Sequence, residues 1–245
     1  MQDPLENDSG AMAHKREIRS YVVRSARMTE AQQAAYDQHV EKWGVRETPN
    51  IISSQTAFDN ENPIHLEIGF GMGDSLATMA EHKPDVNFIG IEVHPPGIGR
   101  LLALVEKKSL RNVRVIQGDA VRLLKARFAD SSLERVNIFF PDPWHKKRHH
   151  KRRLIQANFV ELLRKKLKGR GVLHVATDWK PYAEHVMEVM AASDRWQTMN
   201  PASPIADRES LGRPETKFER RGLKLGHEIV DLAYQTLDSE EAVPT

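Results

Sequence analysis

The sequence predicts an α/β fold in which a doubly wound, mostly parallel sheet carries helices on both of its faces. Two observations lead to this prediction. From Pro63 onward, short apolar segments alternate with segments of helical periodicity, and the apolar segments recur at a regular spacing. The first four begin at residues 64, 87, 113 and 136. This spacing leaves room for one helix between consecutive strands, and right-handed crossovers of that kind give a Rossmann-like sheet.

The expected strands are short runs rich in Ile, Val and Phe, which suit a sheet buried on both faces. They cover Ile64–Ile68, Asn87–Val93, Val113–Gln117, Val136–Phe140 and Val172–Ala176, and Glu228–Thr236 can add a last strand. The expected helices cover Asp74–Lys83, Gly99–Lys108, Ala120–Phe128 and Leu154–Leu167. The last of these places its apolar side chains on one face, at helical spacing. The gap between the fourth and fifth strands is longer than the others, so an additional segment, Pro141–Arg153, follows the fourth strand.

The bulk composition fits one large domain or one domain with an arm. The chain has 245 residues, 40% of them hydrophobic, and a net charge of +2, so total charge does not indicate a nucleic-acid partner. It has no cysteine, which excludes disulfides and zinc thiolates. We find neither a membrane-spanning apolar run nor a signal peptide, and we expect a cytoplasmic protein.

The first 50 residues differ from the rest of the chain. An acidic start precedes a basic stretch, and Thr29 begins a T-x-x-Q pattern with Gln32 that is typical of a helix start. We predict a flexible basic arm with a short helix over residues 1–50 and a catalytic domain over 51–245. The arm is either a solvated segment or one that docks on RNA.

A glycine-rich turn, G-x-G-x-G, follows the first expected strand at Gly69, Gly71 and Gly73. Glycines at this edge of the sheet permit positive φ and let a ligand touch the backbone. A dinucleotide fingerprint requires G-x-G-x-x-G, and here Asp74 takes the place of the third glycine. Because Glu67 and Asp74 flank the turn, a cationic ligand with a sulfonium and an α-amino group is favoured over a pyrophosphate.

Two further acids follow the next two strands. Glu92 ends the second strand, where a carboxylate can accept hydrogen bonds from both ribose hydroxyls. Asp119 follows the third strand, where a carboxylate can accept from an adenine amino group. Each alone could be a helix N-cap. Together with Glu67, three acids at successive strand ends beside a glycine turn indicate a nucleoside cofactor.

Four motifs extend this pattern. They are L-E-I-G-F-G-M-G (Leu66–Gly73), I-E-V-H (Ile91–His94), F-F-P-D-P-W-H-K-K-R-H-H-K-R-R (Phe139–Arg153) and T-K-F-E-R-R-G (Thr216–Gly222). The first is similar to the first motif of class I methyltransferases. Together, over roughly Pro63 to the C-terminus, they resemble the bacterial tRNA (guanine-N7-)-methyltransferase family. The resemblance implies a seven-stranded Rossmann-like sheet and S-adenosylmethionine as cofactor, with S-adenosylhomocysteine as its product. It also implies methylation of N7 of a guanosine in tRNA, at position 46 of the variable loop.

Asp142 is the candidate catalytic residue and is also expected to contact the cofactor. It lies between Pro141 and Pro143, which restrict the backbone after the fourth strand. Guanine N7 carries a lone pair and no proton, so its methylation needs no general base. A carboxylate can stabilise the positive charge that develops on the ring, so catalysis rests on positioning and electrostatics. A rigid turn with a capping Asp is the alternative.

The residues after Asp142 are strongly basic and are candidates for tRNA binding. Trp144 can stack on an unstacked base or belong to the core. Six Lys and Arg residues occur between His145 and Arg153 without an acid among them. Their place at the ligand-binding edge favours phosphate contacts over a merely solvated face. The candidates are Trp144, Lys146, Arg148, His149, His150, Lys151, Arg152 and Arg153.

The resemblance adds two segments that contact the target nucleotide. Asp178 follows the fifth strand and could otherwise cap a helix. Thr216, Lys217, Phe218 and Glu219 lie in a late loop and could otherwise form a surface turn. The histidines of the basic segment sit among cations, so we expect no metal. We expect tRNA as partner, no membrane, no protein partner and a monomer. A nicotinamide-dependent dehydrogenase and a non-catalytic RNA-binding module are the alternatives.

Overall fold

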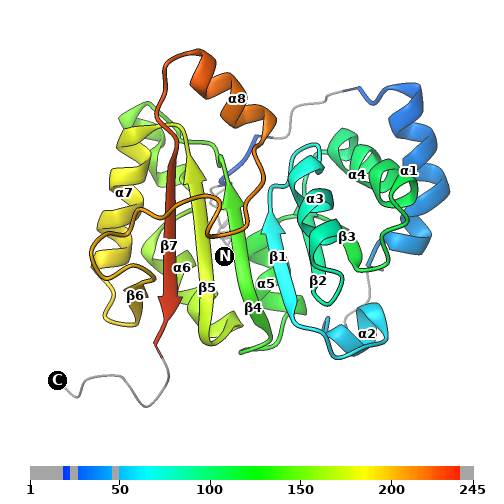
Figure 1. The fold of residues 1–245 in the computed structure, drawn as a ribbon, viewed down its shortest axis with the longest axis horizontal. Helices are drawn as coiled ribbons and strands as arrows, with labels where there is room; N and C mark the ends of the chain where they lie inside the picture. Colours follow the sequence, from blue (N-terminus) through cyan, green and yellow to red (C-terminus); the bar gives the residue numbers. More distant parts are fainter. Residues whose placement is uncertain (1–18, 23–26, 46–49, 238–245) are drawn as a thin grey trace, which may run out of the picture.

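The computed structural model describes residues 19–22, 27–45 and 50–237, and its centre is a single seven-stranded sheet (Figure 1). The strands are β1 (Ile64–Ile68), β2 (Asn87–Glu92), β3 (Val113–Gln117), β4 (Leu133–Phe139), β5 (Leu167–Thr177), β6 (Trp196–Thr198) and β7 (Val230–Thr236). Their order is β3-β2-β1-β4-β5-β7-β6, and β7 runs antiparallel to both of its neighbours. The predicted mostly parallel, Rossmann-like sheet is confirmed.

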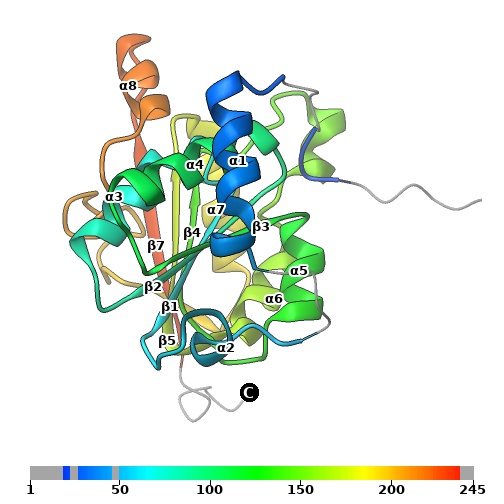
Figure 2. The same cartoon turned by 90° about the vertical axis from the view of Figure 1, so that its right-hand side faces the viewer.

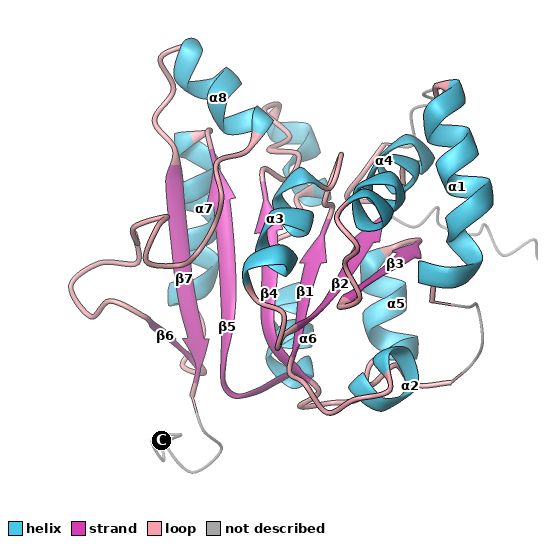
Figure 3. Ribbon diagram, turned by 45° about the vertical axis from the view of Figure 1, so that its right-hand side comes forward, coloured by secondary structure: helices cyan, strands magenta, loops and turns pink. Residues whose placement is uncertain are grey.

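Helices cover both faces of the sheet (Figures 2 and 3). One layer holds α1 (Glu30–Trp43), α3 (Asp74–His82) and α4 (Pro95–Lys107), and the other holds α5 (Ala120–Arg127), α6 (Ala157–Lys166) and α7 (Lys180–Ala191). The short helix α2 (Ser54–Phe58) precedes β1, a 3₁₀ turn η1 (Lys147–Arg152) follows β4, and α8 (Lys217–Lys224) precedes β7. Two apolar cores result, one between the sheet and each layer of helices.

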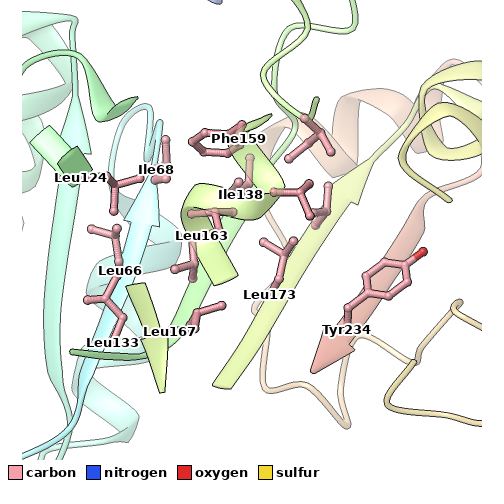
Figure 4. Packing of buried hydrophobic residues seen from close by; sticks show 14 of the residues in the cluster. Leu66, Ile68, Leu124, Leu133, Ile138, Phe159, Leu163, Leu167, Leu173 and Tyr234 are labelled. Carbon is pink, nitrogen blue, oxygen red and sulfur yellow. The ribbon is translucent and has the colours of Figure 1, made fainter. Parts of the chain in front are cut away.

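The larger core lies between the sheet and the layer of α5, α6 and α7. Figure 4 shows Leu66, Ile138 and Leu173 of three neighbouring strands facing Phe159 and Leu163 of α6. All of these side chains are at most 4% exposed. The central strands are thus apolar on this face, whereas the opposite face of β1, β4 and β5 carries the buried polar side chains of His65, Glu67, Asn137 and His174.

Several boundaries differ from those predicted. Helix α4 begins at Pro95 and not at Gly99, because proline is well tolerated in the first turn of a helix. Helix α6 ends at Lys166, and Leu167 already belongs to β5. Helix α7, which also has a proline in its first turn, was not predicted.

The predicted helix start at Thr29 is correct. The Thr29 side chain accepts from the backbone N of Gln32, and the Gln32 side chain accepts from the backbone N of Thr29, which forms a capping box. Helix α1 packs on α4, where a Cβ on Gly99 would lie 2.3 Å from the carbonyl oxygen of Gln32.

The division at residue 50 stays a prediction, since most of the basic arm lies outside the described residues. Within the described part, no helix is long and apolar enough to cross a membrane.

Candidate functional site

A pocket of about 250 Å³ opens at the carboxyl ends of the parallel strands. Its walls come from β1, β2 and β4 and from the turns that follow them, which is where doubly wound sheets bind ligands. We call it the first pocket; its lining includes Gly69, Gly71, Glu92, Gly118, Phe140 and Asp142. Four of the predicted site residues are thereby brought to one cavity: Gly69, Gly71, Glu92 and Asp142.

The glycine turn has the geometry predicted for it. Gly69, Gly71 and Gly73 have φ of +73°, +58° and +78°, a region that side chains with a Cβ rarely enter. Gly73 is also the N-cap of α3. A Cβ on Gly97 of α4 would lie 2.0 Å from the carbonyl oxygen of Gly71, so the turn is pressed against α4. These contacts leave the backbone of the turn exposed to the pocket.

Glu92 is 6% exposed and ties the glycine turn to the end of β2. Its Oε2 accepts from the backbone N of Gly71 at 2.9 Å, and its Oε1 accepts from the backbone N of Val93 at 2.7 Å. Oε1 also accepts from the backbone N of His94 at 3.1 Å. A carboxylate oxygen can accept more than one hydrogen bond, so the predicted contact with ribose hydroxyls is compatible with these bonds and stays a prediction.

Glu67 lies in a second pocket of about 270 Å³, which shares Gly69, Gly71, Phe139 and Phe140 with the first. Its carboxylate is 3% exposed, and its buried Oε2 has no hydrogen-bond partner. Burial, and secondarily the charge of Glu92, raises the pKa of Glu67 to about 8, against the opposing effect of Arg213. A buried acceptor without a partner is costly, and a cationic ligand group would complete it.

Asp119 caps a helix, which is the alternative to cofactor binding that its sequence position left open. It is the N-cap of α5, and its Oδ1 accepts from the backbone N of Arg122 at 3.0 Å. Its neighbours Gly118 and Ala120 line the first pocket. A contact with adenine stays a prediction, since one carboxylate can cap a helix and also accept from a ligand.

Two residues of the N-terminal segment line the first pocket, and no sequence pattern predicts their position. Ser20 and Tyr21 line it together with Gly118, which follows more than 90 residues later in the chain. Burial, followed by the charge of Asp119 and a hydrogen bond to it, raises the pKa of the Tyr21 hydroxyl. The described part of the arm is therefore next to the predicted adenine position.

The turn after β4 holds Asp142 at the mouth of the first pocket. Phe140 has φ of +51°, and its backbone N donates to the carbonyl oxygen of Ala176 at 2.7 Å, which turns the chain away from the sheet. Asp142 itself is exposed. Trp144 is half-buried, with Nε1 donating to the carbonyl oxygen of Ser20 at 3.1 Å, so it does not belong to either apolar core.

The basic segment forms η1 and presents most of its cations to solvent. Lys146, Arg148 and Lys151 are exposed, and His149 and His150 are half-buried. The Arg152 guanidinium lies 3.9 Å from the Trp144 ring centroid, and its Nε donates to the carbonyl oxygen of Arg19. This segment is therefore packed against the described part of the arm.

Arg153 does not have the position expected of a phosphate-binding residue. It is 6% exposed, and its Nε donates to the carbonyl oxygen of Pro143 at 3.0 Å. Its guanidinium also lies 5.4 Å from the ring centroid of Tyr182. The side chain is buried beneath the loop and supports the backbone near Asp142, and an RNA contact of Arg153 stays a prediction.

The two late segments meet each other. Asp178 is not the N-cap of α7, which begins after Trp179; its Oδ2 pairs with His227 Nδ1 at 3.3 Å. Thr216 begins α8 with a capping box to Glu219, so the expectation of a loop or surface turn was wrong there. Thr216 and Lys217 line the second pocket, whereas Glu219 is buried. The side chain of Phe218 lies outside the described residues.

The residues of the two pockets fit S-adenosylmethionine. Glu67 offers a buried carboxylate without a partner, Glu92 offers a fixed carboxylate, and the glycine turn offers an open backbone. A sulfonium and an ammonium complement such an acidic lining, which a pyrophosphate would not. In the described part of the chain, no three His, Asp or Glu side chains gather as a metal ion would need.

The fold has counterparts among solved structures. The crystal structure of the 16S rRNA methyltransferase KamB matches with a TM-score of 0.53 and 11% identity, over 88% of this chain and 97% of that chain. An rRNA methylase from Streptococcus thermophilus matches with a TM-score of 0.50 and 11% identity, over 87% of this chain and 100% of that chain. Fold and site together define a class I methyltransferase.

The sequence comparisons define the family within this class. A family model described as a putative methyltransferase matches residues 61–232. A tRNA (guanine-N(7)-)-methyltransferase of Marinobacter nauticus is 49% identical, over 93% of this chain and 95% of its own length. One of Stutzerimonas stutzeri is 48% identical, over 97% of this chain and 99% of its own length. The chain belongs to the tRNA (guanine-N(7)-)-methyltransferase family.

Proposed function

We propose that this chain transfers a methyl group from S-adenosylmethionine to N7 of a guanosine in tRNA, at position 46 of the variable loop. The observation that carries the proposal is the placement of Asp142 at the mouth of the first pocket, beside the exposed cations of η1. Membership of the family supports the reaction and disfavours a dehydrogenase or a non-catalytic RNA-binding module.

The cofactor is held by residues of the two pockets. The glycine turn and Glu92 bind the nucleoside part, Asp119 the adenine, and Glu67 the cationic amino-acid part. When bound, S-adenosylmethionine supplies an activated methyl group. Because Glu67 is buried and has no other partner at Oε2, a cationic group beside it favours its ionised form.

Asp142 acts on the base and not on a proton of N7. Guanine N7 has a free lone pair, so the protein has no proton to remove before transfer. The Asp142 carboxylate stabilises the positive charge that develops on the ring and accepts from the N1 and amino hydrogens of guanine. Pro141 and Pro143 hold this carboxylate, and Arg153 fixes the carbonyl of Pro143 from below.

The tRNA backbone is bound by the exposed residues around this site. Lys146, Arg148 and Lys151 contact phosphates, and His149, His150 and Arg152 line the same loop. Trp144 stacks on an unstacked base. Asp178, Thr216, Lys217, Phe218 and Glu219 belong to the segments that place the target nucleotide.

The proposal is tested with a tRNA that carries 7-deazaguanosine at position 46. Replacing N7 by carbon removes the lone pair, so this tRNA should bind and accept no methyl group there, while unmodified tRNA yields 7-methylguanosine by nucleoside mass analysis. Methylation of the deaza nucleoside would overturn the assignment of N7.

Asp142→Ala in the same assay should lower the turnover rate far more than tRNA affinity, because the charge matters most as the ring becomes cationic. Asp142→Asn keeps the shape but not the charge and should also be impaired. A fully active Asp142→Ala enzyme would remove this residue from the mechanism and leave N7 as the target.

A further inference from the structure

Helix α8 stands above the carboxyl ends of the strands and is not packed into either layer (Figures 1 and 2). Among the residues whose burial is described in it, only Glu219 and Gly222 are buried, and Leu223 is 52% exposed. The helices that cover the sheet are held by an apolar face, and α8 lacks this support in its described residues. Among its described residues, the contacts that hold α8 in place are polar.

Arg213 makes the polar contact that holds the start of α8. Its Nη1 donates to Oε2 of Glu219 at 2.6 Å, while its Nε and Nη2 donate to the two oxygens of Asp231 at 2.6 and 2.7 Å. The guanidinium side chain is fully buried and has three charge-assisted hydrogen bonds. The bidentate pair with Asp231 fixes the plane of the guanidinium group. If the Arg213 side chain rotated away, the buried carboxylates would lose their partner, which is costly.

The anchoring carboxylate of Asp231 is itself held in the sheet. Asp231 lies on β7, is 4% exposed, and its Oδ1 also lies 2.7 Å from Nε2 of His174 on β5. Two adjacent strands of the sheet, β5 and β7, therefore hold Arg213 in position through Asp231. Glu219 connects that point to α8, because the same Oε2 accepts from the backbone N of Thr216 at 3.3 Å.

The guanidinium also contacts the turn that carries the catalytic carboxylate. Its Cζ lies 5.6 Å from the ring centroid of Phe139 and 5.6 Å from that of Phe140. Both distances are within the range of a cation–π contact. These two residues precede Pro141 and Asp142 directly, so one buried side chain contacts both the Asp142 turn and α8.

We propose that Arg213 is a positioning residue, which fixes the N-terminal end of α8 relative to the Asp142 turn. Thr216 and Lys217, which line the second pocket, are thereby held at one distance from the catalytic carboxylate. Misplacing a substrate by about 1 Å can lower a rate by about a hundredfold. The inference rests on the proposed function, since the substrate that is aligned is the target nucleotide.

The test compares Arg213→Met and Arg213→Lys with the wild-type chain. The stoichiometry of S-adenosylhomocysteine binding counts folded sites, and the turnover number per folded site is then measured at saturating tRNA. We expect about a ten- to hundredfold lower turnover for Arg213→Met. The lysine variant keeps the charge but has no bidentate fork, so we expect an intermediate value.

Backbone amide exchange provides a second readout that does not depend on activity. Peptides covering residues 214–225 should exchange faster in the Arg213 variants, while peptides of β4 and β5 keep the wild-type rate. A residue that merely stabilised the fold would raise exchange in all of these peptides through global unfolding.

Arg208→Met is the matched control. Arg208 reaches the other oxygen of Glu219 at 3.7 Å from a 28% exposed position, so its loss should change turnover by less than about twofold.

The inference is overturned if both Arg213 variants turn over within twofold of wild type per folded site, or if turnover falls without faster exchange in α8. If Arg213→Met does not fold, Arg213→Lys decides. A wild-type chain that does not methylate tRNA contradicts the proposed function, whereas the exchange measurement still tests Arg213.

Discussion

Glu92 joins two backbone turns and faces the first pocket at the same time. Its two oxygens accept from three backbone N–H groups, those of Gly71, Val93 and His94. Charge-assisted bonds of this kind orient the carboxylate before any ligand arrives, so its free lone pairs point in fixed directions. Such preorganisation lowers the entropic cost of binding.

Glu92→Ala should weaken S-adenosylmethionine binding by about ten- to a hundredfold, because each hydrogen bond to a charged group contributes about 1.5–3 kcal/mol. The dissociation constant is measured by calorimetry, with Glu61→Ala, which removes an exposed carboxylate before β1, as the control. A folded Glu92→Ala protein with unchanged affinity would refute the assignment.

The basic turn η1 illustrates how the position of an element decides what its charges can do. Lys147, Arg148 and Lys151 point to solvent, whereas Arg153 of the same run is buried under the Asp142 turn. Only exposed cations can release counterions when RNA binds. The fold thus divides the run of six cations into exposed residues, which we propose to bind RNA, and the buried Arg153, which contacts the backbone of the Asp142 turn.

Replacing Lys147, Arg148 and Lys151 by Ala should weaken tRNA binding and flatten its salt dependence. Each lost phosphate contact reduces the slope of log K against log salt by about 0.7 to 0.9. The control replaces Lys165, Lys168 and Arg170, which are exposed at the opposite edge of the sheet and remove the same charge. Equal slopes for the two variants would mean that η1 acts only through net charge.

The elements that the sequence predicts well are the long apolar ones. The apolar positions of β1 to β5 and of α3 to α6 suffice, because packing against a core leaves apolar residues at regular positions in the sequence. The start of α8 carried a signal of the same kind as Thr29, a T-x-x-E pattern, but its helix has no apolar stripe. Short β6 and α2 have too few residues to show a period.

The site is predictable only where its residues follow strands directly. Gly69, Glu92 and Asp142 do so, and the topology of a parallel sheet brings them together without further information. Tyr21 and Arg213 reach the same region from distant parts of the chain. Tertiary packing determines where these two residues lie, and no local sequence pattern predicts that position.

At the scale of the whole molecule, three buried groups give the unliganded protein a defined pH dependence of stability. Burial lowers the pKa of His65 to about 3 and that of His174 to about 4, in the latter case against the opposing effect of Asp231. Burial raises the pKa of Glu67 from 4.5 to about 8. Stability rises with pH where the unfolded chain binds more protons than the folded one, and falls where it binds fewer.

Between about pH 4.5 and 6.5, the two unfolded histidines bind protons that the folded ones do not, while folded Glu67 keeps one that the unfolded chain loses. Stability from these groups therefore rises with pH in this range. Between about pH 6.5 and 8 only Glu67 differs, and stability falls. We expect a maximum near pH 6.5 in denaturant titrations, and Glu67→Gln should remove the decline above it. A decline that persists unchanged in Glu67→Gln would mean that other groups cause it.

The place of β7 in the sheet has a consequence for the order in which the protein matures during translation. β7 is the last of the described strands in the sequence, yet it lies between β5 and β6 and is the strand that joins β6 to the sheet. On a ribosome, Asp142 and the glycine turn emerge long before residue 230, and domains generally complete their folding as units. Until β7 is inserted, His174 and Arg213 lack the carboxylate of Asp231, and α8 has no fixed anchor. A nascent chain released before this strand would contain the glycine turn and Asp142 but would lack the anchor that we propose for α8.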